Sequence, residues 1–420
     1  MSALSDLQSL LDKVDSYRQA VIDLQAKLVA IPALGPENGG QGEKEKAEAV
    51  ESELRRLGIS DIETLQAPDK RVECGFRPNL IARIPGKRKD RTLWIMAHLD
   101  VVPAGELSQW KSDPFKLTVD GDRLIGRGVE DNHQGLVSAM MAAKALQELL
   151  IVPEQNLGLA IVADEETGSN YGLQFLLHKR PDLFHPHDWI VVPDAGDPQG
   201  RLIEVAEKSI LWIRFHLIGK QCHASTPDLG RNPHRAAAHL IVQLESLHER
   251  FDRLDPVFDP PTCTFEPTKK ENNVPNINTI PADDVFYLDC RILPGYDLAE
   301  VKNEVNNIAA SIGKRFGVQV EISYMQEVTA APPTAADAPV IKALSQAIDA
   351  VKGRKAETIG IGGGTVAAHF REKGFPTAVW STVEDTAHQP NEWALISSTL
   401  ADAKVLIHLL MQNPDGHHPA

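Results

Sequence analysis

The sequence predicts an α/β protein whose main domain is interrupted by a smaller α+β domain. Apolar strand-like runs alternate with helical segments up to about residue 207, and this pattern resumes near residue 328. Between them the order is β-α-β-β-α-β, as in a ferredoxin-like unit. A chain of 420 residues also exceeds one simple core. We therefore expect one domain of residues 1–207 plus 328–420 and an inserted domain of residues 208–327.

The main domain begins with helices and continues as a sheet. Two helices are expected around a loop at 35–42, the second over 43–58 and ended by Gly58. Apolar, β-rich runs predict four strands, with a long helix between two of them: 79–84, 93–97, 157–163, 189–193 and the helix 134–150. A long helix over 391–412 is expected to end this domain.

The inserted domain starts where the pattern changes to alternation. Residues 209–219 alternate like a half-exposed strand, and 232–251 form an amphipathic helix pattern. The remaining expected elements are the strands 262–267 and 285–293, the helix 298–317 and the strand 318–324.

The overall composition excludes several classes of function. A net charge of −15 argues against nucleic acid and anionic membranes as partners, and no apolar run is long enough to cross a membrane. The first residues lack the basic start and apolar stretch of a secretory signal. Four scattered cysteines predict neither disulfides nor a zinc knuckle, so we expect a reducing cytoplasm. The tail with His417 and His418 is expected to be disordered.

Chemically active side chains follow the ends of the predicted strands. His98 and Asp100 come directly after the strand 93–97 and, being two residues apart, share a face. Asp194 follows the strand 189–193 in the same way. In open α/β sheets, ligands bind at the carboxyl edge of the strands.

Three further acidic or histidine-bearing segments extend this set. The stretch VADEETGSN places Asp164, Glu165 and Glu166 after the strand 157–163, and Asp131 lies in a glycine-flanked turn before a helix. His388 lies in a loop before the last helix. One such acid is usually a helix cap, but the recurrence favours a metal site. Carboxylates and imidazoles without cysteine suit a catalytic zinc, manganese or cobalt site.

These residues stand in motifs that resemble a known family. AHLDVVPAG, GRGVEDNHQG, DEETGS, VVPDAGD, GKQCHAS, the segment NTIPADDVFYLDCRILPG, GGGT and HQPNE occur in this order over nearly the whole chain. They resemble the dinuclear zinc amidohydrolases and exopeptidases, which include acetylornithine deacetylase, succinyl-diaminopimelate desuccinylase, aminoacylase and the glutamate carboxypeptidases. The resemblance implies a zinc-exopeptidase-like catalytic domain and an inserted lid and dimerisation domain.

The resemblance also implies two Zn²⁺ per subunit, with Co²⁺ or Mn²⁺ as alternatives. Asp131 would bridge the metals. His98 and Asp194 would complete the protein ligands of one metal, and Glu166 and His388 those of the other. Asp100 would orient His98.

Glu165 would be the general base of the reaction. Two dications balance Asp131, Glu166, Asp194 and a bridging hydroxide, which leaves Glu165 as an unliganded carboxylate beside an acidified water. It would take that water's proton during attack on an amide carbonyl and pass it to the leaving amine.

Residues of the inserted domain and of one glycine-rich turn would bind the substrate. His223 would stabilise the oxyanion, in cis or from the partner of a homodimer. Four positions match substrate-binding residues of the family: Asn278, Arg291, Gly364 and Thr365. For Arg291, a structural role on the strand surface is equally open. Cys222 next to His223 is not expected to be a nucleophile, because adjacent residues on an extended chain point apart.

The expected activity is hydrolysis of the amide bond of a small N-acyl amino acid or a dipeptide. Two alternatives are a dinuclear aminopeptidase or dipeptidase, the aminopeptidase acting without lid participation, and a non-catalytic metal-binding relative. Two departures from the family bear on this. His133 stands where the family commonly has lysine, and an outer-shell or surface role is favoured for it. VAAHF follows GGGT where desuccinylases carry acidic and arginine residues, which argues against a strict desuccinylase. The family pattern gives Asp164 no catalytic role, and its role is left open between capping and bracing its turn.

Overall fold

A computed structural model describes residues 3–412, so His417 and His418 lie outside the described residues. The chain divides into two compact units. Unit 1 holds the chain up to Val205, Thr334–Ile359 and the chain from Thr365 onward, and unit 2 holds Ala206–Pro333 and Gly360–Gly364. Among the described helices, none is long and apolar enough to span a membrane.

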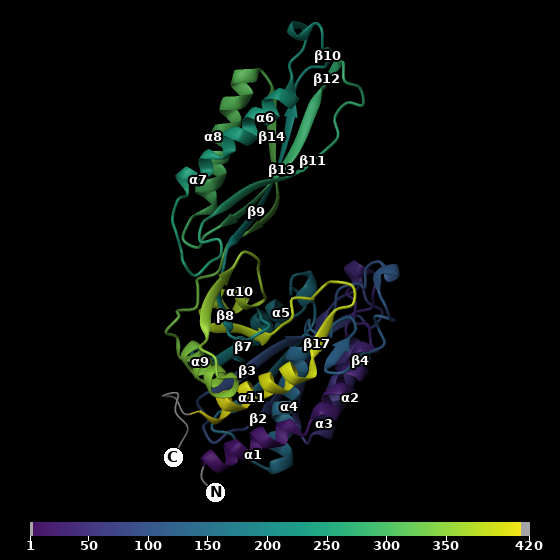
Figure 1. Cartoon of the computed structure of the whole chain (residues 1–420), viewed down its shortest axis with the longest axis vertical. Coiled ribbons are helices and arrows are strands. Elements are labelled where there is room, and N and C mark those ends of the chain that lie inside the picture. Colours follow the sequence, from purple (N-terminus) through teal and green to yellow (C-terminus); the bar gives the residue numbers. More distant parts are fainter. Residues whose placement is uncertain (1–2, 413–420) are drawn as a thin grey trace. The chain divides into compact units, whose positions relative to one another are not determined.

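An eight-stranded mixed sheet forms the centre of unit 1 (Figure 1). Its strands lie in the order β1-β2-β6-β3-β7-β16-β8-β15. Their bounds are Asp61–Pro68 (β1), Phe76–Ile84 (β2), Thr92–His98 (β3), Asn156–Val162 (β6), Trp189–Asp197 (β7), Leu202–Glu207 (β8), Glu357–Ile361 (β15) and Thr377–Thr382 (β16). A separate small sheet contains Thr118–Asp120 (β4), Arg123–Ile125 (β5) and Trp393–Leu395 (β17).

The central strands of this sheet run in one direction. β3 pairs in parallel with β6 and with β7, and β7 pairs in parallel with β16. Their carboxyl ends therefore meet at one edge, where the sequence has its acids and histidines. The predicted α/β class is confirmed.

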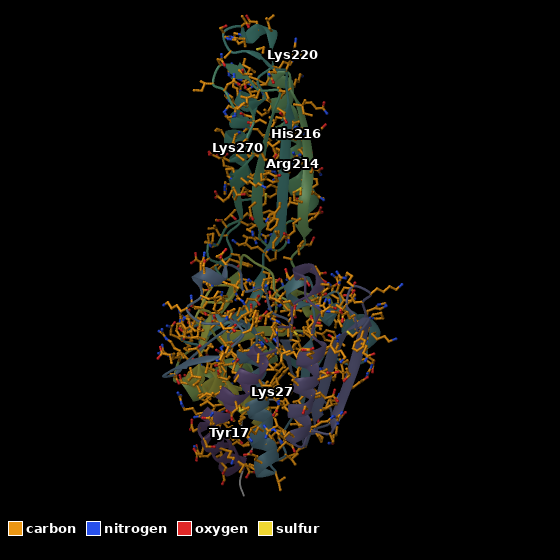
Figure 2. All side chains as sticks on the ribbon, turned by 90° about the vertical axis from the view of Figure 1, so that its right-hand side faces the viewer. Tyr17, Lys27, Arg214, His216, Lys220 and Lys270 are labelled. Carbon is orange, nitrogen blue, oxygen red and sulfur yellow. The ribbon has the colours of Figure 1, made fainter. Side chains whose placement is uncertain are left out.

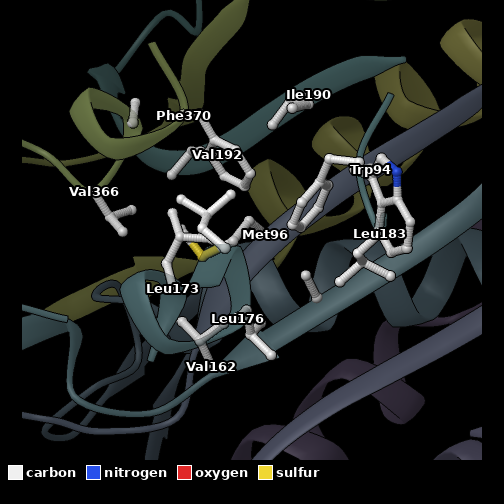
Figure 3. Packing of buried hydrophobic residues seen from close by; sticks show 14 of the residues in the cluster. Trp94, Met96, Val162, Leu173, Leu176, Leu183, Ile190, Val192, Val366 and Phe370 are labelled. Atoms are coloured by element: carbon white, nitrogen blue, oxygen red, sulfur yellow. The ribbon is translucent and has the colours of Figure 1, made fainter. Parts of the chain in front are cut away.

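One face of the sheet packs against two short helices, α5 (Leu173–Lys179) and α10 (Ala367–Glu372). Alternate residues of the strands, such as Trp94 and Met96 on β3, lie in one buried hydrophobic cluster with Leu176 and Phe370 of these helices (Figure 3). Because side chains alternate along a strand, the residues between them face the other side of the sheet.

The other face of the sheet and the surface of unit 1 carry longer helices. Helix α4 (His133–Leu149) contacts β3 and β7, and α11 (Ile396–Met411) packs on α4. The remaining helices are α1 (Ala3–Asp15), α2 (Arg18–Val29), α3 (Lys44–Arg56) and α9 (Pro339–Lys352). The N-terminal segment thus has three helices where the sequence predicts two. The added break lies at Tyr17, whose backbone (φ −92°, ψ 12°) leaves the helical conformation.

Unit 2 is a four-stranded antiparallel sheet with helices. The sheet order is β11-β13-β9-β14, which in chain order is 2-3-1-4, as in a ferredoxin-like unit. The strands are Ser209–Ile218 (β9), Thr264–Lys270 (β11), Asp283–Ile292 (β13) and Gln319–Val328 (β14), and the helices are Pro233–Leu244 (α6), Ser246–Arg250 (α7) and Leu298–Phe316 (α8).

The sheet of unit 2 has one covered and one open face. Phe215 of β9 and Phe286 of β13 stack beneath the helices, with ring centroids 4.7 Å apart. Arg214 and His216, the residues on either side of Phe215, are half-buried on the open face, and Figure 2 marks both on β9. A two-stranded ribbon of Cys222–His223 (β10) and Thr279–Ile280 (β12) projects from this unit.

Candidate metal centre

Five side chains of unit 1 form two potential ligand groups that share Asp131. One group is His98, Asp131 and Asp194, and the other is Asp131, Glu166 and His388. The two carboxylate oxygens of Asp131 face different histidines: Oδ1 lies 3.0 Å from His98 Nε2, and Oδ2 lies 3.1 Å from His388 Nε2. This is the arrangement in which one carboxylate can bridge two metal ions.

Each ligand is placed by the end of a strand or by a loop beside it. His98 is the last residue of β3, Asp194 lies in β7, and Glu166 lies in a 3-10 turn (Glu165–Thr167) that follows β6. His388 has a left-handed backbone, with φ 63°. The structure therefore brings together all five predicted ligands at the carboxyl edge of the sheet.

Asp100 holds both His98 and the turn that carries Glu165. The Nδ1 atom of His98 lies 3.0 Å from the backbone oxygen of Asp100 and 3.5 Å from its carboxylate. The Asp100 carboxylate accepts the backbone N–H groups of Glu165 (3.1 Å) and Glu166 (3.0 Å). Asp100 thus orients His98 mainly through its carbonyl group, and its carboxylate fixes the 3-10 turn.

The pKa values of the two histidines show that the cluster favours positive charge. Burial by itself lowers the pKa of His98, but hydrogen bonds with Asp100, Asp131 and Asp194 outweigh it and raise the pKa well above its usual value. Hydrogen bonds with Asp131 and then Glu166 raise the pKa of His388 to about 10.

The pKa values of the two glutamates in the cluster also indicate that positive charge is favoured there. Burial, followed by repulsion from Asp194, raises the pKa of Glu165 well above its usual value, and burial also raises the pKa of Glu166. Two dications would supply the positive charge that these acids lack. Carboxylate oxygens and imidazole nitrogens without cysteine suit zinc, manganese or cobalt, so the residues present fit a dinuclear metal centre.

Asn132 is a contact that sequence reasoning missed. Its side-chain amide donates to the backbone oxygen of Pro193 (2.7 Å) and to Asp194 Oδ1 (2.9 Å). It therefore links the turn that carries Asp131 to the strand that carries Asp194. Its place in GRGVEDNHQG, directly after Asp131, was the available signal.

Asp164 braces its turn, one of the two roles left open for it. Its carboxylate accepts hydrogen bonds from the Thr167 hydroxyl and from the Tyr171 backbone N–H at 2.9 Å. The Arg77 guanidinium lies 3.6 Å away and forms a fully buried ion pair with Glu43. Nothing in the sequence around Arg77 or Glu43 marked them as neighbours of the site.

His133 is buried behind the ligands. Its Nε2 atom lies 2.9 Å from the Nζ atom of Lys46 on α3, and both side chains are 1% exposed. His133 belongs to neither ligand group. The favoured outer-shell position matches this geometry, whereas a surface position does not.

In unit 2, His223 and Asn278 lie close to each other on the β10–β12 ribbon and its flanks. His223 pairs with Thr279, and the Ala224 N–H donates to the Asn278 carbonyl at 2.8 Å. The Ser225 backbone N–H donates to His223 Nδ1 at 3.1 Å, and the Ser225 hydroxyl lies 2.7 Å from the same atom. Because a backbone N–H only donates, Nδ1 is the acceptor and Nε2 carries the proton. His223 is thus arranged as a neutral hydrogen-bond donor.

The other predicted substrate residues lie elsewhere. Arg291 is the second-last residue of β13. It forms a two-point ion pair with Asp289 (2.7 and 3.0 Å) and donates to the Gly362 carbonyl at 2.7 Å. Gly364 and Thr365 continue this glycine-rich turn. Within unit 2, the structure thus places Arg291 beside the glycine turn and does not bring it together with Asn278. Cys222 donates to the Thr226 carbonyl (3.5 Å) and not to His223.

Comparisons with known proteins identify the class of this arrangement. The pattern of Peptidase family M20/M25/M40 matches residues 94–412. An uncharacterized metallohydrolase of Methanocaldococcus jannaschii is 40% identical over 93% of this chain and 99% of its own. A second one, from Methanococcus maripaludis, is 38% identical over 96% and 100%. The succinyl-diaminopimelate desuccinylase of Dinoroseobacter shibae is 27% identical over 90% and 94%.

Solved structures share the fold. Human carnosine dipeptidase 1 superposes with a TM-score of 0.71 at 17% identity, covering 96% of this chain and 98% of its own. The YXEP protein of Bacillus subtilis, a dinuclear metal-binding peptidase, gives a TM-score of 0.63 at 18% identity, covering 94% and 98%.

Fold and site together define a metal-dependent hydrolase of amide or peptide bonds. The chain belongs to Peptidase family M20/M25/M40.

Proposed function

We propose that this protein hydrolyses the amide bond of a small N-acyl amino acid or a dipeptide, with Glu165 as general base. The observation that carries the proposal is the pair of ligand groups sharing Asp131. Glu165 lies on the same turn as Glu166, and the backbone N–H groups of both residues donate to the Asp100 carboxylate. Relatives named as desuccinylase and carnosine dipeptidase support a small, peptide-like substrate.

His98 and Asp194 would hold one metal ion, Glu166 and His388 the other, and Asp131 both. Zinc is proposed, with cobalt or manganese as alternatives. Bound there, the ions would polarise the substrate carbonyl and lower the pKa of a water molecule to near neutrality.

Glu165 takes the proton from the attacking water and passes it to the leaving amine. Its carboxylate is suited to this because, among residues 3–412, no side chain forms a hydrogen bond with it that would compete for the proton. Asp100 keeps the base in place through the backbone N–H groups of the turn.

Unit 2 is proposed to act as a lid and to mediate a homodimer. His223 would donate its Nε2–H to the oxyanion of the tetrahedral intermediate, in cis or from a second subunit. Asn278, Arg291, Gly364 and Thr365 are proposed to bind the substrate. Arg291 already pairs with Asp289, so this role requires that the pair open or that the substrate contact another edge of the guanidinium. A cytoplasmic location is part of the proposal.

A substrate panel tests the activity. Acetyl, succinyl and other N-acyl amino acids and dipeptides are incubated with protein that has been stripped by chelator and reloaded with zinc, manganese or cobalt. Hydrolysis of at least one panel member that disappears on chelation supports the proposal. Two bound metal ions without hydrolysis of any member would favour a non-catalytic relative. If a His223→Ala protein keeps full activity on peptides with a free amino terminus, an aminopeptidase without lid participation would be favoured.

A further inference from the structure

Two buried carboxylates tie the segment of Asp131 to the segment of His388. Glu130 lies next to Asp131 in the turn after β5, and Glu392 lies four residues after His388. Both side chains are almost fully buried, at 4% and 0% exposure. Each carboxylate reaches into the segment that carries the other.

Glu392 accepts hydrogen bonds from the Asp131 segment with both oxygens. Its Oε1 atom accepts the backbone N–H groups of Glu130 (2.9 Å) and Asp131 (3.1 Å). Its Oε2 atom accepts the backbone N–H of Gly128 (3.0 Å) and the guanidinium of Arg127 (2.6 Å). Four donors therefore converge on one carboxylate.

Glu130 makes the reciprocal contacts with the His388 segment. Its Oε1 atom accepts the backbone N–H of Glu384, and its Oε2 atom accepts the N–H of Thr386 (2.7 Å) and the Thr386 hydroxyl. The Gly126 N–H adds a backbone hydrogen bond to the Glu392 carbonyl at 3.0 Å.

The His388 segment needs such support. Asp385, His388 and Asn391 all have positive φ angles, between 58° and 63°. Non-glycine residues rarely adopt this conformation and keep it only where the surrounding structure stabilises it. The hydrogen bonds of Glu130 and Glu392 stand at both ends of this strained loop.

We propose that Glu130 and Glu392 are positioning residues that act as one unit, the carboxylate brace, and set the distance between Asp131 and His388. The inference rests on the proposed function, because it assumes that these two ligands hold a metal ion. Neither glutamate side chain forms a hydrogen bond with the side chain of a metal ligand. Glu392 is linked to Asp131 through the backbone N–H of Asp131. The brace therefore acts on metal binding through the placement of Asp131 and His388.

Zinc titration of the stripped protein against a chromophoric chelator tests the brace without any substrate. Glu130→Gln and Glu392→Gln each turn an amide N–H₂ toward backbone donors, and each is expected to weaken one of the two zinc sites by about 10- to 100-fold. A His388→Ala protein identifies that site, because it should lower the zinc affinity in the same titration step as the glutamine variants do. In the double variant the loss should be smaller than the product of the two single losses.

Asp188→Asn is the matched control. Asp188 is also a buried carboxylate (5% exposed), and it accepts the Thr92 and His185 backbone N–H groups and the Trp94 indole, but at the amino ends of the strands. Its loss should lower stability and leave both zinc affinities unchanged. Equal zinc affinities in all variants, equal weakening in the control, or fully multiplicative losses in the double variant would overturn the inference.

If the glutamine variants do not fold, Thr386→Val replaces them; it removes the hydroxyl that donates to Glu130 and that also bonds the backbone of Trp393, the residue after Glu392. A loss of about threefold at the same zinc site is then expected, and an unchanged affinity contradicts the brace. A wild-type protein that binds fewer than two zinc ions would instead count against the proposed function.

Discussion

Arg77 and Glu43 form an ion pair in which neither side chain is exposed to solvent. The Nε–Oε2 distance is 2.6 Å, and the same guanidinium lies 3.6 Å from the Asp164 carboxylate. Glu43 accepts the backbone N–H of Asp164, next to Glu165 and Glu166, so one buried cation contacts two acids that support this turn.

We predict that Arg77→Met lowers the free energy of unfolding by about 3–5 kcal/mol, because it leaves Glu43 buried without its partner. Urea unfolding of the chelated protein measures this loss. Arg88→Met, which removes an exposed ion pair with Asp90, is the control and should cost less than about 1 kcal/mol. Similar losses in the two variants would contradict this account of the turn.

Ser225 is predicted to keep His223 in the form that donates from Nε2. Ser225→Ala removes the hydroxyl that lies 2.7 Å from Nδ1. We expect kcat to fall about 2- to 10-fold, which corresponds to the net free energy of one hydrogen bond. KM should change little, because the contact matters most once the oxyanion forms. Ser225→Thr retains the hydroxyl and should restore kcat. An unchanged kcat in the alanine variant would show that the backbone N–H alone fixes the ring.

Tyr17 should make stability fall at alkaline pH. Burial, and then the hydrogen bond to Glu148 (2.9 Å), raise the pKa of the Tyr17 hydroxyl far above its usual value; Figure 2 marks the residue. The folded protein keeps this proton above pH ~10, where the unfolded chain loses it. Stability from this group is therefore present below pH ~10 and is lost as pH rises, by up to ~1.4 kcal/mol per unit.

Urea unfolding of wild type and Tyr17→Phe at pH 9, 10 and 11 measures this effect, with chelator present throughout. At pH 9 the variant should be less stable by about 1 kcal/mol, because the hydrogen bond is missing. The difference should shrink or reverse by pH 11. A difference that stays constant over this range would show that Tyr17 does not titrate on unfolding.

The sequence was most informative where the signal is local. Apolar runs such as residues 93–97 and 157–163 predicted the strands, and their ends placed His98 and Glu166 at one edge of the sheet. The order of elements in unit 2 was predictable for the same reason. The helix expected over 232–251 is two helices that divide at Glu245, a break that periodicity does not encode.

The supporting contacts were not predictable because they join distant parts of the chain. Glu392 accepts the N–H of Asp131 from a sequence separation of 261 residues, and Lys46 reaches His133 across 87 residues. No local pattern distinguishes such a buried glutamate or lysine from one on the surface. Asp100 shows the intermediate case, since its place beside His98 was expected but its hold on the Glu165 turn was not.

The most direct test of the central claim is the metal content and turnover of Glu165→Gln, measured on the substrate that the panel identifies. If Glu165 is the base and not a ligand, the variant should bind two zinc ions with wild-type affinity while kcat falls by a factor of about 10²–10⁴. Glu154→Gln, which alters a partly exposed ion pair with Lys87 far from the ligands in sequence, should match wild type in both measurements. A Glu165→Gln protein that binds two zinc ions and turns over at the wild-type rate would contradict the mechanism.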